Sequence, residues 1–293
     1  MARSAESSVH PFFYGSARFK KSIKKPSRLG LCVLSLLLGS VPLFCQKQSA
    51  HSDPEAVALA SRAMAALTGG NVINDVTLVG SATWRGDGND ESGTATLKAL
   101  GTAESRIDIS LPGGARTEIR DASSGTTQGL WINPNGKSGK FAYHNTLTDA
   151  AWFFPQLGSL AGGREVILKY IGQETRNELT VEHLRSYMRD QGGQKQAVLL
   201  FEKLNAMDFY LDANTMLPVA IIFNVHPDNN ANANLLTEVD FSEYQKVDGI
   251  SAPLHIQKFV QGNLFLDISV AKTLLNTGLG LAEFSIKPEE RGR

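Results

Sequence analysis

Short apolar runs separated by turn residues dominate the second half of the chain. Five such runs follow one another between Met207 and Val270, and each is bounded by Asn, Asp, Gly or Pro. Turn residues at this spacing are typical of an antiparallel meander, in which each strand pairs with the next. The pattern predicts strands at 207–211, 219–225, 236–244, 254–260 and 264–270.

Apolar and polar positions also alternate in the first half, most clearly from Ala103 to Leu111, where Ile107 and Ile109 stand between charged or polar residues. Alternation with period two indicates a strand that buries one face. Sequential strands with short turns pair antiparallel, because a parallel crossover needs about a dozen residues or more. We predict strands at 76–85, 94–100, 103–111, 115–121, 128–132 and 140–144, and again at 166–173 and 178–188.

A helical period replaces this alternation near residue 54. Ser52-Asp53-Pro54-Glu55 offers an N-cap and a proline at the first helical position, and Gly69-Gly70 ends the pattern. We therefore predict a helix over 54–67, with an apolar face formed by Val57, Ala60, Met64 and Leu67. For 197–204 the pattern leaves both helix and strand open.

The turn residues of the second half resemble those of a known superfamily. Tyr210–Pro218 (YLDANTMLP), followed by Val239–Tyr244 (VDFSEY) and Val247–Pro253 (VDGISAP), is similar to the later strands of the outer-membrane lipoprotein carriers, the LolA/LolB-like proteins. The resemblance covers the chain from about residue 53 on. It implies a mainly β fold, an antiparallel half-open (unclosed) β-barrel with an N-terminal helix, wrapped round an apolar cavity that carries acyl chains.

One segment between the two groups of strands, 146–160, is apolar on nearly every side. Thr146 and Asp149 have the spacing of a capping box, and Pro155 is expected to kink or end the helix. We predict an inserted apolar helix, which is normally buried. Given the resemblance, it is either a plug or lid inside the half-barrel or a helix packed on the open end as ordinary core.

The first 45 residues have the composition of a leader. Seven basic side chains and one acidic side chain lie in 1–28, and an apolar run covers 29–44. This is the pattern of a secretory signal peptide, and the sixteen apolar residues fall short of the ~20 that span a bilayer. We predict a signal peptide at 1–45 and a single β domain at 46–293 that is exported to the periplasm, with a membrane-anchored form as the alternative.

Without this leader the chain is mildly acidic, with 22 basic and 28 acidic residues. The surplus of acidic residues argues against nucleic acid or an anionic membrane surface as partner. Both cysteines, Cys32 and Cys45, belong to the leader region, so the body forms no internal disulfide. Cys45 is a candidate for acylation, but Phe44 is larger than the small residue that precedes the cysteine in lipoprotein signals.

No motif for catalysis or metal binding keeps its required spacing. Gly136-Lys137-Ser138 lacks the first glycine of a P-loop, because Trp131 stands there. The turn at 87–90 lacks the glycine and glutamate of a calcium-binding EF-hand loop. The histidines are isolated from one another, and Gly-x-Ser-x-Gly is absent. We predict no cofactor, no metal and no enzymatic activity; a hydrolase assembled from distant residues stays open.

Large apolar side chains are the candidates for lining a cavity or forming its lid. Each is also a candidate for plain core. We predict an exported protein that binds a lipid or acylated partner and makes peripheral contact with the outer membrane. The alternative is a structural or interaction module of the envelope with a filled barrel. The cavity and lid candidates are Trp84, Trp131, Leu147, Trp152, Phe153, Phe154, Leu157 and Phe223.

Overall fold

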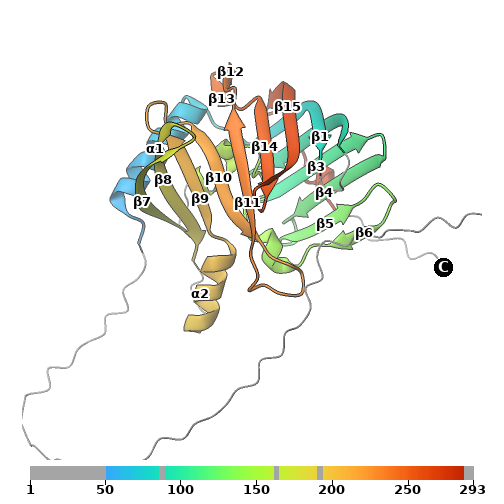
Figure 1. The fold of residues 1–293 in the computed structure, drawn as a ribbon, viewed down its shortest axis with the longest axis horizontal. Helices are drawn as coiled ribbons and strands as arrows, with labels where there is room; N and C mark the ends of the chain where they lie inside the picture. The colour runs from blue at the N-terminus through green and yellow to red at the C-terminus, as the bar shows by residue number, and fades with distance from the viewer. Residues whose placement is uncertain (1–50, 86–89, 162–164, 190–193, 287–293) are drawn as a thin grey trace, which may run out of the picture. The chain divides into compact units, whose positions relative to one another are not determined.

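A thirteen-stranded antiparallel sheet carries the fold of the described residues (Figure 1). The structure, a computed structural model, describes residues 51–85, 90–161, 165–189 and 194–286. The predicted leader at 1–45, including Cys45, and most of the turn at 87–90 lie outside these residues.

The strand order is that of two meanders joined in the middle. It runs β6-β5-β4-β3-β2-β1-β15-β14-β11-β10-β9-β8-β7, so β1 and β15 join the two halves. The first half contains β1 Asp75–Trp84, β2 Glu91–Leu100, β3 Glu104–Leu111, β4 Gly114–Asp121, β5 Gln128–Ile132 and β6 Ser138–Lys140. The second contains β7 Val166–Arg176, β8 Leu179–Met188, β9 Met207–Asp212, β10 Pro218–Val225, β11 Leu235–Ser242, β14 His255–Val260 and β15 Asn263–Leu275. A separate hairpin is formed by β12 Gln245–Val247 and β13 Ile250–Ala252.

This sheet is not closed, because β6 and β7 stand at its two ends and do not pair. The predicted mainly β fold with an open antiparallel sheet is therefore confirmed. The strand predicted at 140–144 was wrong, because β6 ends at Lys140 and a 3₁₀ turn, η1, covers Tyr143–Thr146. The last strand was predicted to end at 270, but β15 continues to Leu275.

Helix α1 spans Pro54–Thr68 and confirms the predicted helix. Gly69 ends it in the left-handed conformation, at φ 59°, which glycine adopts without strain. The predicted apolar face is rotated, however, since Val57 is 43% exposed. Small side chains allow the helix to lie close to the sheet, and its buried face consists of Ala56, Leu59, Ala60, Ala63 and Leu67.

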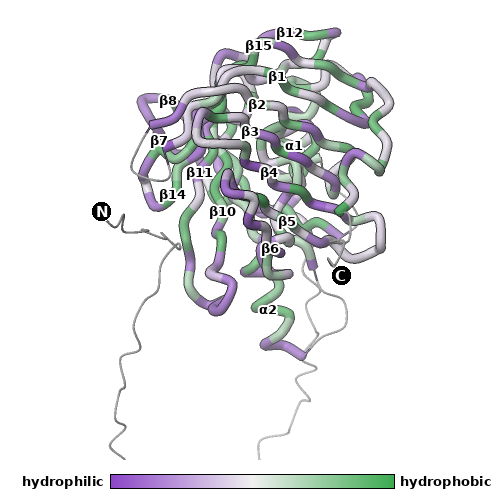
Figure 2. Tube along the Cα trace, turned by 90° about the vertical axis from the view of Figure 1, so that its right-hand side faces the viewer, coloured by the Kyte–Doolittle hydropathy of each residue, from purple (hydrophilic) through white to green (hydrophobic). Residues whose placement is uncertain are grey.

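We call the side of the sheet that packs with α1 the inner face. Along β9, β10 and β11, Phe209 lies opposite Ile221 and Ile221 opposite Val239, and all three are buried in the main core. Hydrophobic and hydrophilic residues are interspersed along the chain (Figure 2), and in β11 the buried Val239 and Phe241 alternate with Glu238, Asp240 and Ser242. This alternation, which the sequence predicted, separates an inner from an outer face.

Helix α2, Lys195–Leu204, settles the open alternative for 197–204 in favour of a helix. It projects from the end of β8 (Figure 1). Its Leu204 is buried, but Leu199 and Leu200 are 55% and 38% exposed. Within the described ranges, no helix combines the length and apolar character that crossing a bilayer requires.

The inserted apolar helix predicted at 146–160 is absent. Instead the crossing segment, as we call residues 143–161, forms three short 3₁₀ turns: η1, η2 Pro155–Leu157 and η3 Ser159–Ala161. Pro155 has no N–H for a helical ladder. Asp149 does not act in a capping box, because its carboxylate accepts hydrogen bonds from the N–H and hydroxyl of Ser159. The segment is nevertheless buried, as its apolar composition requires, with Phe153 and Phe154 at 0% exposure.

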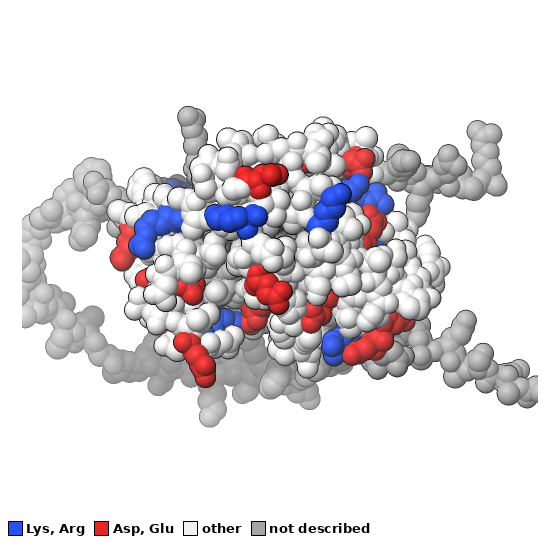
Figure 3. All heavy atoms as spheres, turned by 90° about the horizontal axis from the view of Figure 1, so that it is seen from above, with Lys and Arg blue, Asp and Glu red and all other residues white. Residues whose placement is uncertain are grey.

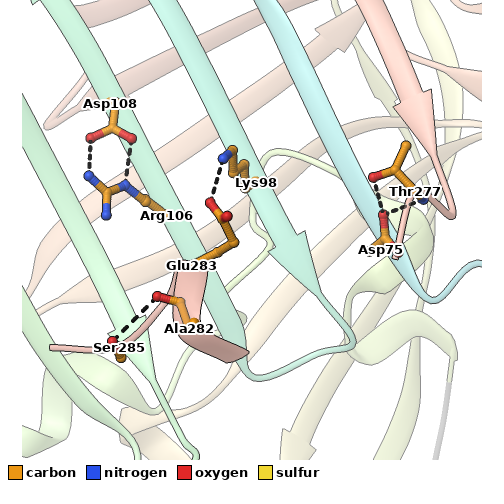
Figure 4. Close-up of polar contacts among 8 residues, drawn as sticks. All are labelled: Asp75, Lys98, Arg106, Asp108, Thr277, Ala282, Glu283 and Ser285. Atoms are coloured by element: carbon orange, nitrogen blue, oxygen red, sulfur yellow. Dashed lines mark hydrogen bonds and ion pairs between the residues drawn. The ribbon is translucent and has the colours of Figure 1, made fainter. Parts of the chain in front are cut away.

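The outer face of β1–β4 is crossed by a C-terminal strap, residues 276–286 (Figure 4). Asp75 accepts hydrogen bonds from Thr277 N–H at 2.8 Å and Gly278 N–H at 2.9 Å. Glu283 pairs with Lys98 at 2.7 Å, and Phe284 is fully buried. The strap therefore gives this part of the sheet a covered outer face as well as a covered inner one.

Candidate ligand cavity

Two adjoining cavities lie on the inner face. The larger has a volume of about 170 Å³ and the smaller about 50 Å³. Both are lined by the same five residues, so they share a wall: Ile107, Glu118, Trp152, Lys258 and Phe265.

The larger cavity is lined by strands that are far apart in the sheet. Arg120 of β4 and Phe223 of β10 both line it, although β4 and β10 are separated by six strands in the sheet order. The sheet must therefore curl round this space. Apolar groups form most of the lining, which includes Ile107, Phe141, Phe223, Val225, Leu235 and Val260.

Aromatic rings form the wall of the smaller cavity. Trp84 and Phe265 meet edge to face with their ring centroids 4.3 Å apart. Phe265 has no partner on β14, because Leu264 lies opposite Phe259 and Leu266 opposite Lys258. This β-bulge turns the Phe265 side chain towards the cavity. The Nε1 of Trp84 is buried without a hydrogen-bond partner among the described residues.

Three charged residues of β4 face inwards. Glu118 lies opposite Ile107 on one side and Trp131 on the other, and all three residues line the smaller cavity. Arg116 and Arg120 share this face by the two-residue period of the strand. The Arg116 guanidinium lies 4.2 Å from the centre of the Trp84 ring, a cation–π contact.

Arg120 is fixed by the crossing segment. Its guanidinium donates to the carbonyl oxygens of Thr148 and Asn145, the latter at 3.3 Å. Burial lowers the pKa of Arg120, partly offset by the carboxylates of Glu118 and Asp149. Burial likewise raises the pKa of Asp149, and the hydrogen bonds from Ser159 oppose that rise. These contacts connect the cavity wall to the segment that crosses the inner face.

Lys258 of β14 is the cationic residue of the shared wall. Its Nζ lies 4.5 Å from the centre of the Trp152 ring. It makes no hydrogen bond or ion pair with a described residue. Burial lowers the pKa of Lys258, while Glu118 acts in the opposite direction.

The structure brings together some of the predicted cavity residues and separates others. Trp84, Trp131 and Trp152 line the smaller cavity, and Trp152 and Phe223 line the larger one. The other four, Leu147, Phe153, Phe154 and Leu157, are buried but line neither cavity. That any of the eight contacts a ligand stays a prediction.

Sequence reasoning did not identify the charged lining. Arg116, Glu118 and Arg120 follow one another at period two, which in a sequence is typical of a solvent-facing side. Period two shows that they share a face, but not which face that is.

The described residues contain no cluster of three or more His, Cys, Asp or Glu that could hold a metal ion. The surface seen from above mixes acidic and basic side chains with many uncharged ones (Figure 3).

No family model and no curated protein matches the sequence. Solved structures do match. An outer membrane lipoprotein-sorting domain from Vibrio parahaemolyticus has 13% identity and a TM-score of 0.49, covering 78% of this chain and 96% of its own. A DUF1329 family protein from Desulfovibrio piger has 12% identity and a TM-score of 0.48, covering 79% and 96%. A LolA superfamily protein from Nitrosomonas europaea has 9% identity and a TM-score of 0.46, covering 79% and 97%. At 9–13% identity these are distant structural similarities.

Proposed function

We propose that this chain is an exported, non-enzymatic protein that binds a lipid, or the acyl chain of an acylated partner, in the adjoining cavities. The observation that carries the proposal is the aromatic and aliphatic lining of these cavities, which includes Trp84, Trp152 and Phe223. An acyl chain gains about 0.8 kcal/mol for each CH₂ group that it buries. No covalent step is needed for such binding.

The volume of the cavities limits the length of acyl chain that they can hold without a movement of the protein. The larger cavity, at about 170 Å³, is close to the ~150 Å³ of engineered apolar cavities that stay dry and bind benzene. A short part of an acyl chain therefore fits. A longer chain requires the two cavities to merge, and Trp152, in their shared wall, is the side chain whose movement would join them.

The crossing segment is suited to act as the lid. It connects β6 with β7, the two ends of the sheet, and consists of 3₁₀ turns instead of a strand or an α-helix. Segments without such regular hydrogen bonding open at lower free energy than the sheet that surrounds them. We infer that Trp152 and its neighbours move to admit the chain.

Replacing Trp152 and Phe153 by alanine is expected to weaken binding of a fluorescent fatty acid by about tenfold or more, because Trp152 contributes aromatic surface to both cavities. Phe259→Ala, on β14 outside both linings, is the matched control and should bind as the wild type does. Titrations are run well below the unfolding temperature of each variant. Unchanged binding by the double variant would contradict the lid.

The alternative, an interaction module with a filled inner face, is favoured by the modest cavity volume. The main core already fills much of this face with residues of α1 and the crossing segment. Native mass spectrometry of the protein from its own host separates the two proposals. A co-purifying lipid supports the carrier, whereas a bare polypeptide mass together with no binding of fatty acids supports the module.

Peripheral contact with the outer membrane is proposed through α2. Leu199 and Leu200 are exposed there, between Lys195 and Lys203. The Lys203 ammonium donates to the carbonyl of Asn232 at 3.4 Å, in the loop between β10 and β11. The strand ends that this loop connects line the larger cavity. A bilayer at α2 would therefore lie close to the lining of the cavity.

Changing Leu199 and Leu200 to serine is expected to reduce binding to zwitterionic phosphatidylcholine vesicles by about tenfold, since each leucine loses roughly 1 kcal/mol or more of apolar burial. Co-sedimentation measures the bound fraction. Leu236→Ser, which changes an exposed leucine of β11, is the control. Equal sedimentation of the double variant and the wild type would rule out α2 as the contact.

A further inference from the structure

Lys258 occupies an inward position on a strand that is otherwise apolar on that side. It lies opposite Val239 of β11 and Leu266 of β15, both of which are buried. Two residues to either side, Ile256 and Val260 share its face, by the alternation of the strand. An ammonium group therefore stands where the pattern places an aliphatic side chain.

This ammonium has no counterion among the residues that the structure describes. Glu118 lines the same cavities, but no described carboxylate lies within 4.0 Å of the Lys258 Nζ. The Trp152 ring at 4.5 Å supplies a cation–π contact, which compensates only a small part of the cost of desolvating an ammonium group. A charge that is partly removed from water is normally paired, so the half-buried Lys258 ammonium, which faces a cavity, is suited to bind an anion.

The charged residues around Lys258 also favour an anionic ligand. Arg120 and Lys258 line the larger cavity against the one carboxylate of Glu118. Arg120 is fixed by the carbonyl groups of Thr148 and Asn145 and makes no ion pair with a described carboxylate. At half-buried positions such as these, a surplus of positive charge acts more strongly than in free solution.

We propose that the ligand of these cavities is a single-chain amphiphile with an anionic head group, a carboxylate or a phosphate, whose oxygens accept hydrogen bonds from the Lys258 ammonium. The chain then lies against the aromatic and aliphatic lining near Phe223. This inference rests on the proposed function, since it requires that the cavities bind an amphiphile. It adds that Lys258 selects for the charge of the head group.

Isothermal titration calorimetry of the full chain with octanoate, octyl phosphate and octanol tests this selection at constant chain length. Wild-type protein is expected to bind the anions at least about tenfold more tightly than octanol, the effect of a charged hydrogen bond in a dry site. A preference for only one of the two anions identifies the head group as carboxylate or phosphate.

Lys258→Met should abolish the preference for the anions over octanol. Lys258→Arg keeps the positive charge and should therefore retain most of the preference for the anions. Lys272→Met is the matched control, because Lys272 is an exposed lysine of β15 and should show the wild-type preference. If Lys258→Met does not fold, the wild-type preference and Lys258→Arg still decide the outcome.

The possible failures are distinguishable. If none of the three amphiphiles binds, the proposed function itself fails. If all three bind with similar affinity, and Lys258→Met changes none of them, the cavity binds amphiphiles but the assignment of the anionic head group to Lys258 is overturned.

Discussion

Replacing Asp149 by alanine is expected to destabilise the protein by about 3 kcal/mol, because it leaves buried polar groups without partners. The Asp149 side chain accepts hydrogen bonds from the N–H of Ser159, at 2.8 Å, and from its hydroxyl. Asp149 is only 8% exposed. Its charge also acts on the buried guanidinium of Arg120. Alanine removes both the hydrogen-bond acceptor of Ser159 and the negative charge near Arg120.

Asp149→Asn separates these two contributions. An asparagine amide can accept from the Ser159 N–H and donate to the Ser159 hydroxyl, so only the charge is lost. We expect a destabilisation of about 1 kcal/mol, smaller than for alanine. Urea denaturation at pH 7 measures both values, and Asp90→Ala, which breaks the exposed pair with Arg85, is the control with a loss of about 0.5 kcal/mol or less.

Native-state hydrogen exchange tests where Asp149→Ala acts. The amides of the crossing segment should exchange faster than in the wild type, while those of β9 and β10 stay protected until global unfolding. If the alanine variant is no less stable than Asp90→Ala, the contact between Asp149 and Ser159 does not hold the segment. Faster exchange in the crossing segment with little global loss would instead show that this contact controls the lid alone.

The same contact explains why the sequence predicted the wrong structure for this segment. Apolar residues at helical spacing over 146–160 predict a helix, and Pro155 predicts a kink or an end within it but not the loss of the whole helix. What decides is a bond between Asp149 and Ser159, ten residues apart, together with the docking of Arg120 from β4. Burial of the segment followed from its composition, but its backbone conformation depends on contacts that no local window contains.

The meanders could be predicted because each depends on neighbouring residues only. Alternation fixes which side chains share a face, and turn residues such as Asp248-Gly249 fix where the chain reverses. The joining of β1 to β15 has no such signal, because its partners are separated by nearly the whole described chain.

The charged cavity lining could not be predicted for a related reason. A strand with one covered face shows that face by its apolar residues, but β4 is covered on both sides. Ile119 is buried on one face while Arg116, Glu118 and Arg120 line the cavity on the other. The polar residues of β4 therefore predict a solvent-facing side that in fact lines the cavity. The C-terminal strap explains this, because it covers the opposite face of the strand.

Removing the anchor of that strap is the second change with a large expected effect. Asp75 is 2% exposed and accepts hydrogen bonds from the N–H of Thr277, Gly278 and Leu279 and from the Thr277 hydroxyl (Figure 4). Asp75→Ala leaves the three N–H groups without their acceptor. We expect a loss of about 3 kcal/mol, since hydrogen bonds to charged groups contribute about 1.5–3 kcal/mol each and solvent replaces part of them once the strap detaches.

The pH dependence of the loss identifies the carboxylate as its cause. Burial alone would raise the pKa of Asp75, but the hydrogen bonds from the strap outweigh it and hold the pKa below 3.8. Because the folded pKa lies below the unfolded one, the carboxylate stabilises the fold fully above the unfolded value, and this stabilisation is lost as the pH falls through the folded one. The difference in unfolding free energy between wild type and Asp75→Ala should therefore be constant from pH 5 to 7 and shrink below pH 4.

Glu283→Ala provides the comparison within the same strap. Its carboxylate pairs with Lys98 at 2.7 Å in an exposed position, where solvent screens the interaction, so the variant should unfold almost as the wild type does. Chemical denaturation between pH 3 and 7 compares the three proteins. Equal stability of Asp75→Ala and Glu283→Ala at pH 7 would mean that the strap is held by the burial of Phe284 instead of by Asp75. A difference that does not shrink in acid would mean that the missing side chain, and not its charge, causes the loss.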